Sequence, residues 1–308
     1  MALLEVSKVG FKYYGSDFEL RDVDLSLDKG EKLVIYGCEN AGKTTLLRIL
    51  CGLEKYDCGS ILLDGTELKE LSQKDMNVGF SFDRRILEGK ALAEDVISFP
   101  MKLRNISSES VADYLKRVSE KYNIPLQMRV KDLSDLQIVI LILARLFAVD
   151  RRLYLVDDVW KDLSQEQKII VFDFLKENIA GKSVIVATDD TDFAKEISTD
   201  KVVVTTDKEV APMMSLEEIS ARPLNMQSAI FAGYELHIGR LIKVEDNYFA
   251  QLYGKEYAVA QPIGDIYVDK RVCFAVKRSS GPCDVQEVGE GIVMNFYYDV
   301  DNEKVISK

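Results

Sequence analysis

The chain reads Gly37-Cys38-Glu39-Asn40-Ala41-Gly42-Lys43-Thr44-Thr45 between an apolar run at residues 33–36 and an apolar stretch at residues 46–50. A glycine-rich loop between a strand and a helix is typical of a phosphate-binding loop, because its tight turn points successive backbone N–H groups at phosphate oxygens. Lys43 would reach the β- and γ-phosphate oxygens, and the Thr44 hydroxyl would ligate Mg²⁺. We therefore expect a nucleotide triphosphate site lined by Gly37, Asn40, Ala41, Gly42, Lys43, Thr44 and Thr45.

A second apolar segment, residues 153–156, runs directly into two adjacent acids, Asp157 and Asp158. A carboxylate at the end of a buried strand commonly holds Mg²⁺ in a phosphate-loop protein, and the following acid polarises the attacking water. The alternative is a core strand that leads into two solvated acids. The phosphate loop upstream favours the functional interpretation, with Thr44 and Asp157 as metal ligands and Asp158 as a catalytic residue.

Between these segments, residues 133–137 read Leu-Ser-Asp-Leu-Gln and lead into an apolar stretch that contains Ala144-Arg145. In this order of motifs the chain resembles the nucleotide-binding subunits of ABC transporters, whose signature reads Leu-Ser-Gly-Gly-Gln. The resemblance implies that Ser134 and Gln137 contact ATP held by an opposing subunit. It also implies that Tyr14 stacks on adenine.

The resemblance implies an α/β fold of the P-loop NTPase type, doubly wound as in ABC ATPases, over residues 1–234 with a helical insertion at about 84–150. In the family this insertion docks onto membrane subunits, and Ile86, Leu87 and Leu92 are candidates for that contact. From residue 235 to residue 308, short runs of alternating apolar and polar residues are separated by turn sequences, which predicts a small β-barrel. The barrel resembles the OB-like domain, of the TOBE type, that sugar-importer ATPases carry.

Three single positions depart from the family pattern. Asp83 stands where the family has a metal-sensing glutamine and is expected to remain a metal ligand. Asp158 replaces the water-polarising glutamate, and Asp189 replaces the histidine that donates a hydrogen bond to the γ-phosphate. An ionised aspartate at the last position would repel the phosphate by about 1 to 4 kcal/mol at 4 Å, depending on the dielectric. We therefore expect Asp158 and Asp189 to support feeble hydrolysis.

The signature is the fourth departure. Leu133, Ser134 and Gln137 match the family, whereas Asp135 and Leu136 replace the two glycines that let backbone N–H groups approach the phosphate. Asp135 would either block that approach or complement the dipole at the start of a helix. Both interpretations remain open from the sequence.

Composition limits the alternatives. The 308 residues correspond to about two domains, and 47% hydrophobic residues suffice for a buried core. No apolar stretch approaches the roughly 18 residues that cross a bilayer, and no signal segment is recognised, so a soluble, unprocessed chain is expected. Five cysteines without paired spacing indicate a reducing interior. A net charge of −11 disfavours binding to nucleic acid or anionic membranes.

These observations predict the ATP-binding subunit of an ABC transporter of the importer type, which couples ATP binding and weak hydrolysis to solute transport. The implied cofactors are ATP and Mg²⁺, and the implied partners are membrane permease subunits with either a second ATPase subunit or a second copy of this chain. The location would be cytoplasmic, peripheral on the inner face of the membrane. One alternative is a nucleotide-sensing regulatory pseudo-ATPase. Another is nucleic-acid handling by the β-barrel, where strand packing is the simpler explanation for the interleaved basic and aromatic residues at 248–257.

Overall fold

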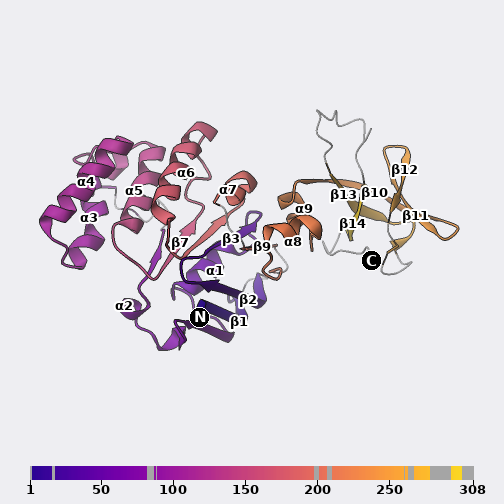
Figure 1. Ribbon diagram of the computed structural model, residues 1–308, viewed down its shortest axis with the longest axis horizontal. Coiled ribbons are helices and arrows are strands. Elements are labelled where there is room, and N and C mark those ends of the chain that lie inside the picture. Colours follow the sequence, from indigo (N-terminus) through magenta and orange to yellow (C-terminus); the bar gives the residue numbers. More distant parts are fainter. Residues whose placement is uncertain are drawn as a thin grey trace. The chain divides into compact units, whose positions relative to one another are not determined.

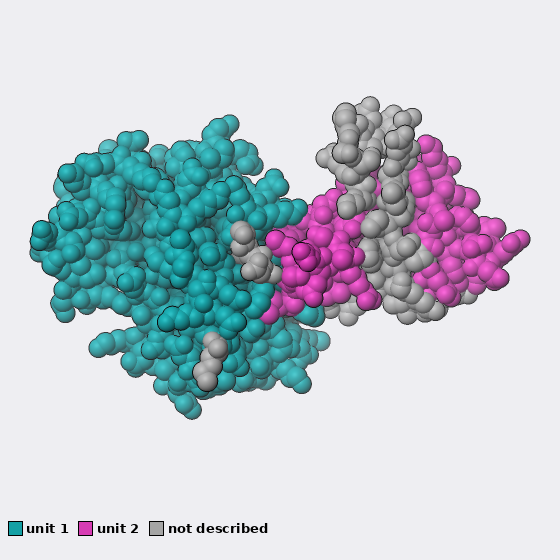
Figure 2. All heavy atoms as spheres, in the orientation of Figure 1, with its two compact units in different colours: residues 1–212 teal, residues 213–308 magenta. Residues whose placement is uncertain are grey.

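The computed structural model describes residues 2–15, 18–81, 87, 89–197, 201–206, 210–259, 261–262, 267–277 and 293–299. The chain divides into two compact units, residues 1–212 and residues 213–308, which Figure 2 colours separately. Each unit has its own core and is described by itself.

The first unit is built on a parallel sheet of five strands in the order β6-β7-β8-β3-β9. These strands are β3 (Lys32–Gly37), β6 (Val78–Phe80), β7 (Leu153–Asp157), β8 (Val184–Thr188) and β9 (Lys201–Thr205). Most of their residues are buried, as expected for parallel strands that are covered on both faces. Because parallel strands end at the same edge, the sheet brings together the segments that follow β3, β7 and β8.

A second, antiparallel sheet completes this part of the unit in the order β2-β1-β4-β5. Its strands are β1 (Ala2–Lys12), β2 (Glu19–Asp28), β4 (Cys58–Leu63) and β5 (Thr66–Glu67). The central helix α1 (Lys43–Leu50) follows β3 and contacts β3, β7 and β8, and its buried residues include Leu46, Leu47, Ile49 and Leu50.

In its described residues, the helical insertion expected at about 84–150 contains three α-helices, which group to one side of the parallel sheet in Figure 1. They are α3 (Ala93–Leu103), α4 (Ser108–Tyr122) and α5 (Asp135–Phe147). A 3₁₀-helix, Val130–Asp132, precedes α5. Helix α5 buries eight of its residues against α3, α4 and α6 (Gln165–Ile179), so it joins the insertion to the sheet. The described part of this unit also contains the helices α2 (Gln73–Met76) and α7 (Thr191–Glu196) and a 3₁₀-helix at Leu68–Glu70.

The second unit contains an antiparallel sheet in the order β12-β11-β10-β13-β14. The strands are β10 (Tyr234–Val244), β11 (Asn247–Leu252), β12 (Lys255–Val259), β13 (Arg271–Lys277) and β14 (Val293–Asp299). Contacts between β12 and β14 bring the two edges of the sheet toward each other, which is compatible with the expected OB-like domain. Alternate residues of β13 face two different clusters, one of which is centred on Leu241 and Phe274.

Helices α8 (Leu216–Ala221) and α9 (Met226–Phe231) precede this sheet and pack on it. Ala229 of α9 belongs to the cluster of Tyr234, Cys273 and Tyr298. The hydroxyl of Tyr298 donates a hydrogen bond to the carbonyl of Pro223 at 3.4 Å. The sequence assigned these helices to the first domain by its boundary at residue 234, whereas the contacts group them with the strands. Among all described helices, none combines the length and the apolar composition that a membrane crossing requires.

Candidate functional site

The phosphate loop connects the end of β3 to the start of α1 in the conformation that the sequence predicts. Gly42 has φ of 85° just before the helix, in the left-handed region that favours glycine. Gly37 is required for space, because a Cβ atom there would lie 2.3 Å from Oγ1 of Thr205. Asn40 has φ of 64°, which asparagine tolerates better than other side chains. The loop therefore has the backbone needed to turn its N–H groups inward.

Lys43 is buried, and its ammonium group lies over the phosphate loop. Nζ donates hydrogen bonds to the carbonyl of Gly37 at 2.6 Å and to the carbonyl of Cys38 at 2.8 Å. An ammonium group has three donors, and the two carbonyls use two of them. The geometry fixes the positive charge at the mouth of the loop, where the terminal phosphates of a nucleotide would bind.

Thr44 and Asp157 come from distant parts of the chain and meet at the edge of the parallel sheet. Oγ1 of Thr44 donates a hydrogen bond to Oδ1 of Asp157 at 3.1 Å, and Thr44 is exposed. The backbone N–H of Asp157 donates to Oγ of Ser81 at 2.8 Å, which fixes the end of β7. A hydroxyl and a carboxylate are hard oxygen ligands, so this pair suits Mg²⁺. Asp83, the third expected ligand, lies outside the described residues.

Asp158 and Asp189, the two expected catalytic residues, interact with each other. Asp158 is largely buried, and this burial, reinforced by the nearby charge of Asp189, raises the pKa of Asp158 to about 7 although Lys43 acts in the opposite direction. Oδ1 of Asp158 has no hydrogen-bond partner within the described part of the chain. The backbone φ of Asp158 is 24°, which is unusual for a residue other than glycine. Asp158 therefore retains its proton at a higher pH than a solvated aspartate does.

A partly buried ion pair supports the strand end that carries Asp189. Nζ of Lys168 on α6 lies 3.0 Å from Oδ2 of Asp190, and the two side chains are only 13% and 16% exposed. Oδ1 of Asp190 accepts a hydrogen bond from the backbone N–H of Phe193 and so caps α7. Neither Lys168 nor Asp190 is predicted from the sequence to contribute to the site. Because they are far apart in sequence and belong to no motif, no local signal marks them.

Two aromatic side chains lie beside the phosphate loop, and neither is Tyr14. The hydroxyls of Tyr13 and Thr45 share a hydrogen bond of 3.4 Å, and the rings of Tyr13 and Phe18 are 6.0 Å apart. The ring of Phe18 lies so close to Gly42 that a Cβ atom there would be 2.6 Å from it. Tyr14 is fully exposed. Its stacking on adenine stays a prediction, and Tyr13 is a second candidate that the sequence analysis overlooked.

We expect Tyr13→Ala to weaken ATP binding more than Tyr14→Ala, because Tyr13 already lies against the loop and α1. Loss of a stacking ring costs about 1–3 kcal/mol. Isothermal titration of both variants with ATP measures the difference, and Tyr13→Phe, which keeps the ring, is the control. A larger loss for Tyr14→Ala would assign the stacking to Tyr14.

Ser134 and Gln137 form the N-terminal cap of α5. Oγ of Ser134 accepts a hydrogen bond from the backbone N–H of Gln137 at 3.3 Å, and Oε1 of Gln137 accepts from the backbone N–H of Ser134 at 3.0 Å. Nε2 of Gln137 also donates to the carbonyl of Asn123 at 2.9 Å. Asp135 occupies the first turn, where an acid complements the helix dipole. Within one chain these residues have a structural role, and their contact with ATP across a subunit interface stays a prediction.

Comparison with known proteins shows which proteins the chain resembles. Residues 20–161 match the family model for ABC transporters, a range that includes the phosphate loop, the capped α5 and Asp157. Over this range the chain is similar to ABC transporter ATP-binding proteins. Its first unit has the α/β fold of ABC ATPases with a phosphate-binding loop.

The chain is similar to ATP-binding proteins of importers. It is 29% identical over 255 residues to the spermidine/putrescine import ATP-binding protein PotA of Thermotoga maritima, covering 80% of this chain and 68% of the relative. It is 31% identical over 223 residues to the sulfate/thiosulfate import ATP-binding protein CysA of Bacillus cereus, covering 69% of this chain and 61% of the relative. The chain thus spans between three fifths and seven tenths of these relatives' length.

Solved structures agree on the fold of the ABC ATPase. A dimeric structure of MJ0796, a bacterial ABC transporter cassette, has a TM-score of 0.61 and 20% identity, and it covers 69% of this chain and 98% of the cassette. A second structure of MJ0796 captures a dimeric post-hydrolysis state bound to ADP and Pi, with the same TM-score.

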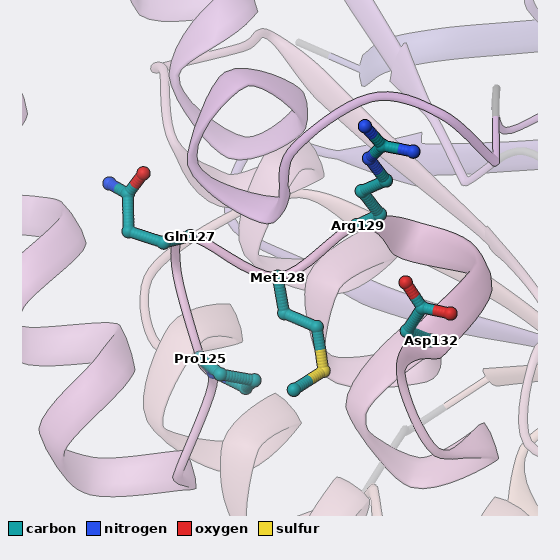
Figure 3. Close-up of a pocket in the computed structure, with 5 residues that line it drawn as sticks. All are labelled: Pro125, Gln127, Met128, Arg129 and Asp132. Atoms are coloured by element: carbon teal, nitrogen blue, oxygen red, sulfur yellow. The ribbon is translucent and has the colours of Figure 1, made fainter.

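Two pockets are found among the described residues of the first unit, and the phosphate loop lines neither of them. One, of about 530 Å³, is lined by Pro125, Gln127, Met128, Arg129 and Asp132. Figure 3 shows the Met128 side chain extending between Pro125 and Asp132, beside the segment that leads to α5. A second, of about 330 Å³, lies between the helical insertion and β6, and its lining includes Leu87, Phe99, Arg104, Arg145 and Arg151. Of the docking candidates, Leu87 lines this pocket, whereas Ile86 lies outside the described residues.

Proposed function

We propose that this chain is the ATP-binding subunit of an ABC importer and that it binds ATP together with Mg²⁺. The observation that carries the proposal is the contact between the Thr44 hydroxyl and the Asp157 carboxylate at 3.1 Å, beside the ammonium group of Lys43. Lys43 and the N-terminus of α1 would bind the phosphates. Thr44, Asp157 and Asp83 would hold the metal ion, which neutralises charge on the β- and γ-phosphate oxygens.

The second unit supports an importer with an accessory β domain of the TOBE type at residues 235–308. The match to PotA covers 80% of the chain, more than the 212 residues of the first unit, so the similarity continues into the second unit. Several relatives are named as import proteins, for spermidine/putrescine, sulfate/thiosulfate and methionine. These names favour transport over the regulatory pseudo-ATPase.

The pocket between the insertion and β6 is our candidate for the contact with a membrane permease subunit. Phe99 is 50% exposed and Leu103 is 68% exposed at this pocket, although both are large apolar residues. Arg104, Arg145 and Arg151 add positive charge to the lining. An amphipathic segment of a permease with an acidic residue would complement this surface, and the subunit would then lie on the cytoplasmic face of the membrane through its partners.

The replaced catalytic and signature residues favour weak hydrolysis and a hetero-assembly. A site that combines two copies of this chain would pair the Asp158 and Asp189 carboxyls with Asp135 and Leu136 of the opposing signature. An intact second ATPase subunit would supply a competent signature to this chain's nucleotide. We propose that the ATP site of this chain is mainly structural or regulatory in such an assembly.

Purification from detergent-solubilised membranes tests the assembly. The tagged chain should bring down membrane subunits together with a second ATPase subunit. The double variant Phe99→Asp, Arg104→Glu should lose the membrane subunits, whereas Ile169→Asp should retain them, because Ile169 is similarly exposed, at 59%, but does not line the pocket. Recovery of the chain alone, with full ATP binding, would favour the regulatory protein.

A further inference from the structure

An ion pair joins the two segments that form the candidate nucleotide site. Nζ of Lys161 lies 3.8 Å from Oε1 of Glu39, and their side chains are 58% and 78% exposed. Glu39 belongs to the phosphate loop. Lys161 follows Asp158 in the segment after β7, where its backbone N–H donates to the carbonyl of Asp158 at 3.3 Å. The pair therefore spans the mouth of the site from the phosphate loop to the segment that carries the acids.

Acidic side chains outnumber basic ones at the mouth of the candidate nucleotide site. Glu39, Asp157, Asp158 and Asp189 surround a site in which Lys43 already donates to two loop carbonyls. A nucleoside triphosphate adds further negative charge, most of it at its terminal phosphate. Besides Lys43 and the proposed Mg²⁺, a further positive charge would stabilise such a phosphate among these acids, and an ammonium on a long flexible stem is suited to supply it.

The backbone before Lys161 is held firmly while its side chain remains accessible. Trp160 is fully buried, and its ring packs against Phe193 of α7 with centroids 4.3 Å apart. This packing anchors the segment on the protein core. Lys161 can therefore change its partner by rotating its side chain, without a movement of the backbone.

We propose that Lys161 is a specificity residue that exchanges Glu39 for the terminal phosphate of a bound nucleoside triphosphate. The proposal rests on the ATP binding proposed above. Breaking the contact between Lys161 and Glu39 costs little free energy, because an exposed ion pair of this length contributes little stability. A phosphate oxygen forms a stronger, charge-assisted hydrogen bond with an ammonium group. Lys161 would thereby distinguish triphosphates from diphosphates, a function that the lost histidine position can no longer perform.

Isothermal titration of the full chain with ATP and with ADP, each in the presence of Mg²⁺, tests this role. Lys161→Ala should lower the affinity for ATP about tenfold, as expected for loss of one exposed charge-assisted contact, and should leave the affinity for ADP unchanged. Lys161→Arg should retain most of the preference for ATP. Glu39→Gln should raise the affinity for ATP, because it removes a competing anion and releases Lys161.

The control is Lys116→Ala, which removes a similarly exposed ion pair, with Glu120 at 4.0 Å, from helix α4. This variant should bind both nucleotides as the unmodified chain does. Equal losses for ATP and ADP in Lys161→Ala, or no loss for either, would overturn the proposal and leave the ion pair with a local structural role. Failure of the unmodified chain to bind ATP would instead contradict the proposed function.

Discussion

Lys43→Ala is expected to abolish ATP binding by the isolated chain. The substitution removes the positive charge that two carbonyl contacts, at 2.6 and 2.8 Å, hold at the mouth of the phosphate loop. It leaves Asp157 and the carboxyl pair of Asp158 and Asp189 as the dominant charges beside the phosphates. Isothermal titration at millimolar ATP with Mg²⁺ measures the loss, for which we expect no detectable heat.

Two observations keep this result interpretable. The thermal unfolding of Lys43→Ala should remain cooperative, which shows that the variant is folded. The unmodified chain should bind ATP under the same conditions. If Lys43→Ala retained ATP affinity near that of the unmodified chain, the phosphate loop would not be the nucleotide site.

ATP turnover by the purified chain should lie far below the typical enzyme value of about 10 per second. Hydrolysis depends on donors that stabilise charge developing on the transferred phosphoryl group, and the resemblance to ABC ATPases implies an acid, Asp189, at the family's histidine position. The same resemblance implies that Asp158 replaces a longer glutamate, and Asp158 interacts with Asp189. A phosphate-release assay measures the rate, with Lys43→Ala as the control for contaminating ATPases. Ordinary turnover that this control abolishes would show that the carboxyl pair supports catalysis.

Low ATP turnover could arise from the acids Asp158 and Asp189 or from the signature residues Asp135 and Leu136. Changing each group to the residues that the family has distinguishes these two causes. Asp158→Glu with Asp189→His should raise the rate only when another chain supplies a competent signature. In the assembled complex, Asp135→Gly with Leu136→Gly should raise the ATPase rate more than the first pair of changes does. These two residues belong to the signature that would face the ATP held by the second ATPase subunit. The melting temperature of the second variant must be measured, since glycine weakens the first turn of α5. A native complex with two copies of this chain and full transport activity would contradict this account.

The sequence was sufficient to predict the central part of the site. The phosphate loop and the strand before Asp157 each have a local pattern, and the rule that parallel strands end at one edge brings them together. The contact between Thr44 and Asp157 confirms that these segments meet, although their residues are widely separated in sequence.

The sequence could not supply contacts that depend on side-chain direction. Tyr13 and Tyr14 are adjacent and follow β1, which ends at Lys12, in a segment where no regular strand pattern decides the side that each ring takes. A difference of one residue decides which ring faces the loop, and the motif does not fix it. Ser81 and the ion pair of Lys168 with Asp190 are tertiary contacts between segments that carry no motif. Helices α8 and α9 are too short for their apolar pattern to indicate which core they join.

The packing of α8 and α9 has a consequence for how this chain could be divided or recombined. The cluster of Ala229, Tyr234, Cys273 and Tyr298 contains residues from both sides of position 234. A gene fusion or truncation at residue 234 would separate the helices from the strands and expose one face of β13 to water. A junction between Pro212 and Met213 would keep this cluster whole. The helices α8 and α9 and the strands of the second unit should therefore be exchanged between proteins as one segment. A chimaera that received the strands alone would need other residues to take the place of Ala229 and its neighbours.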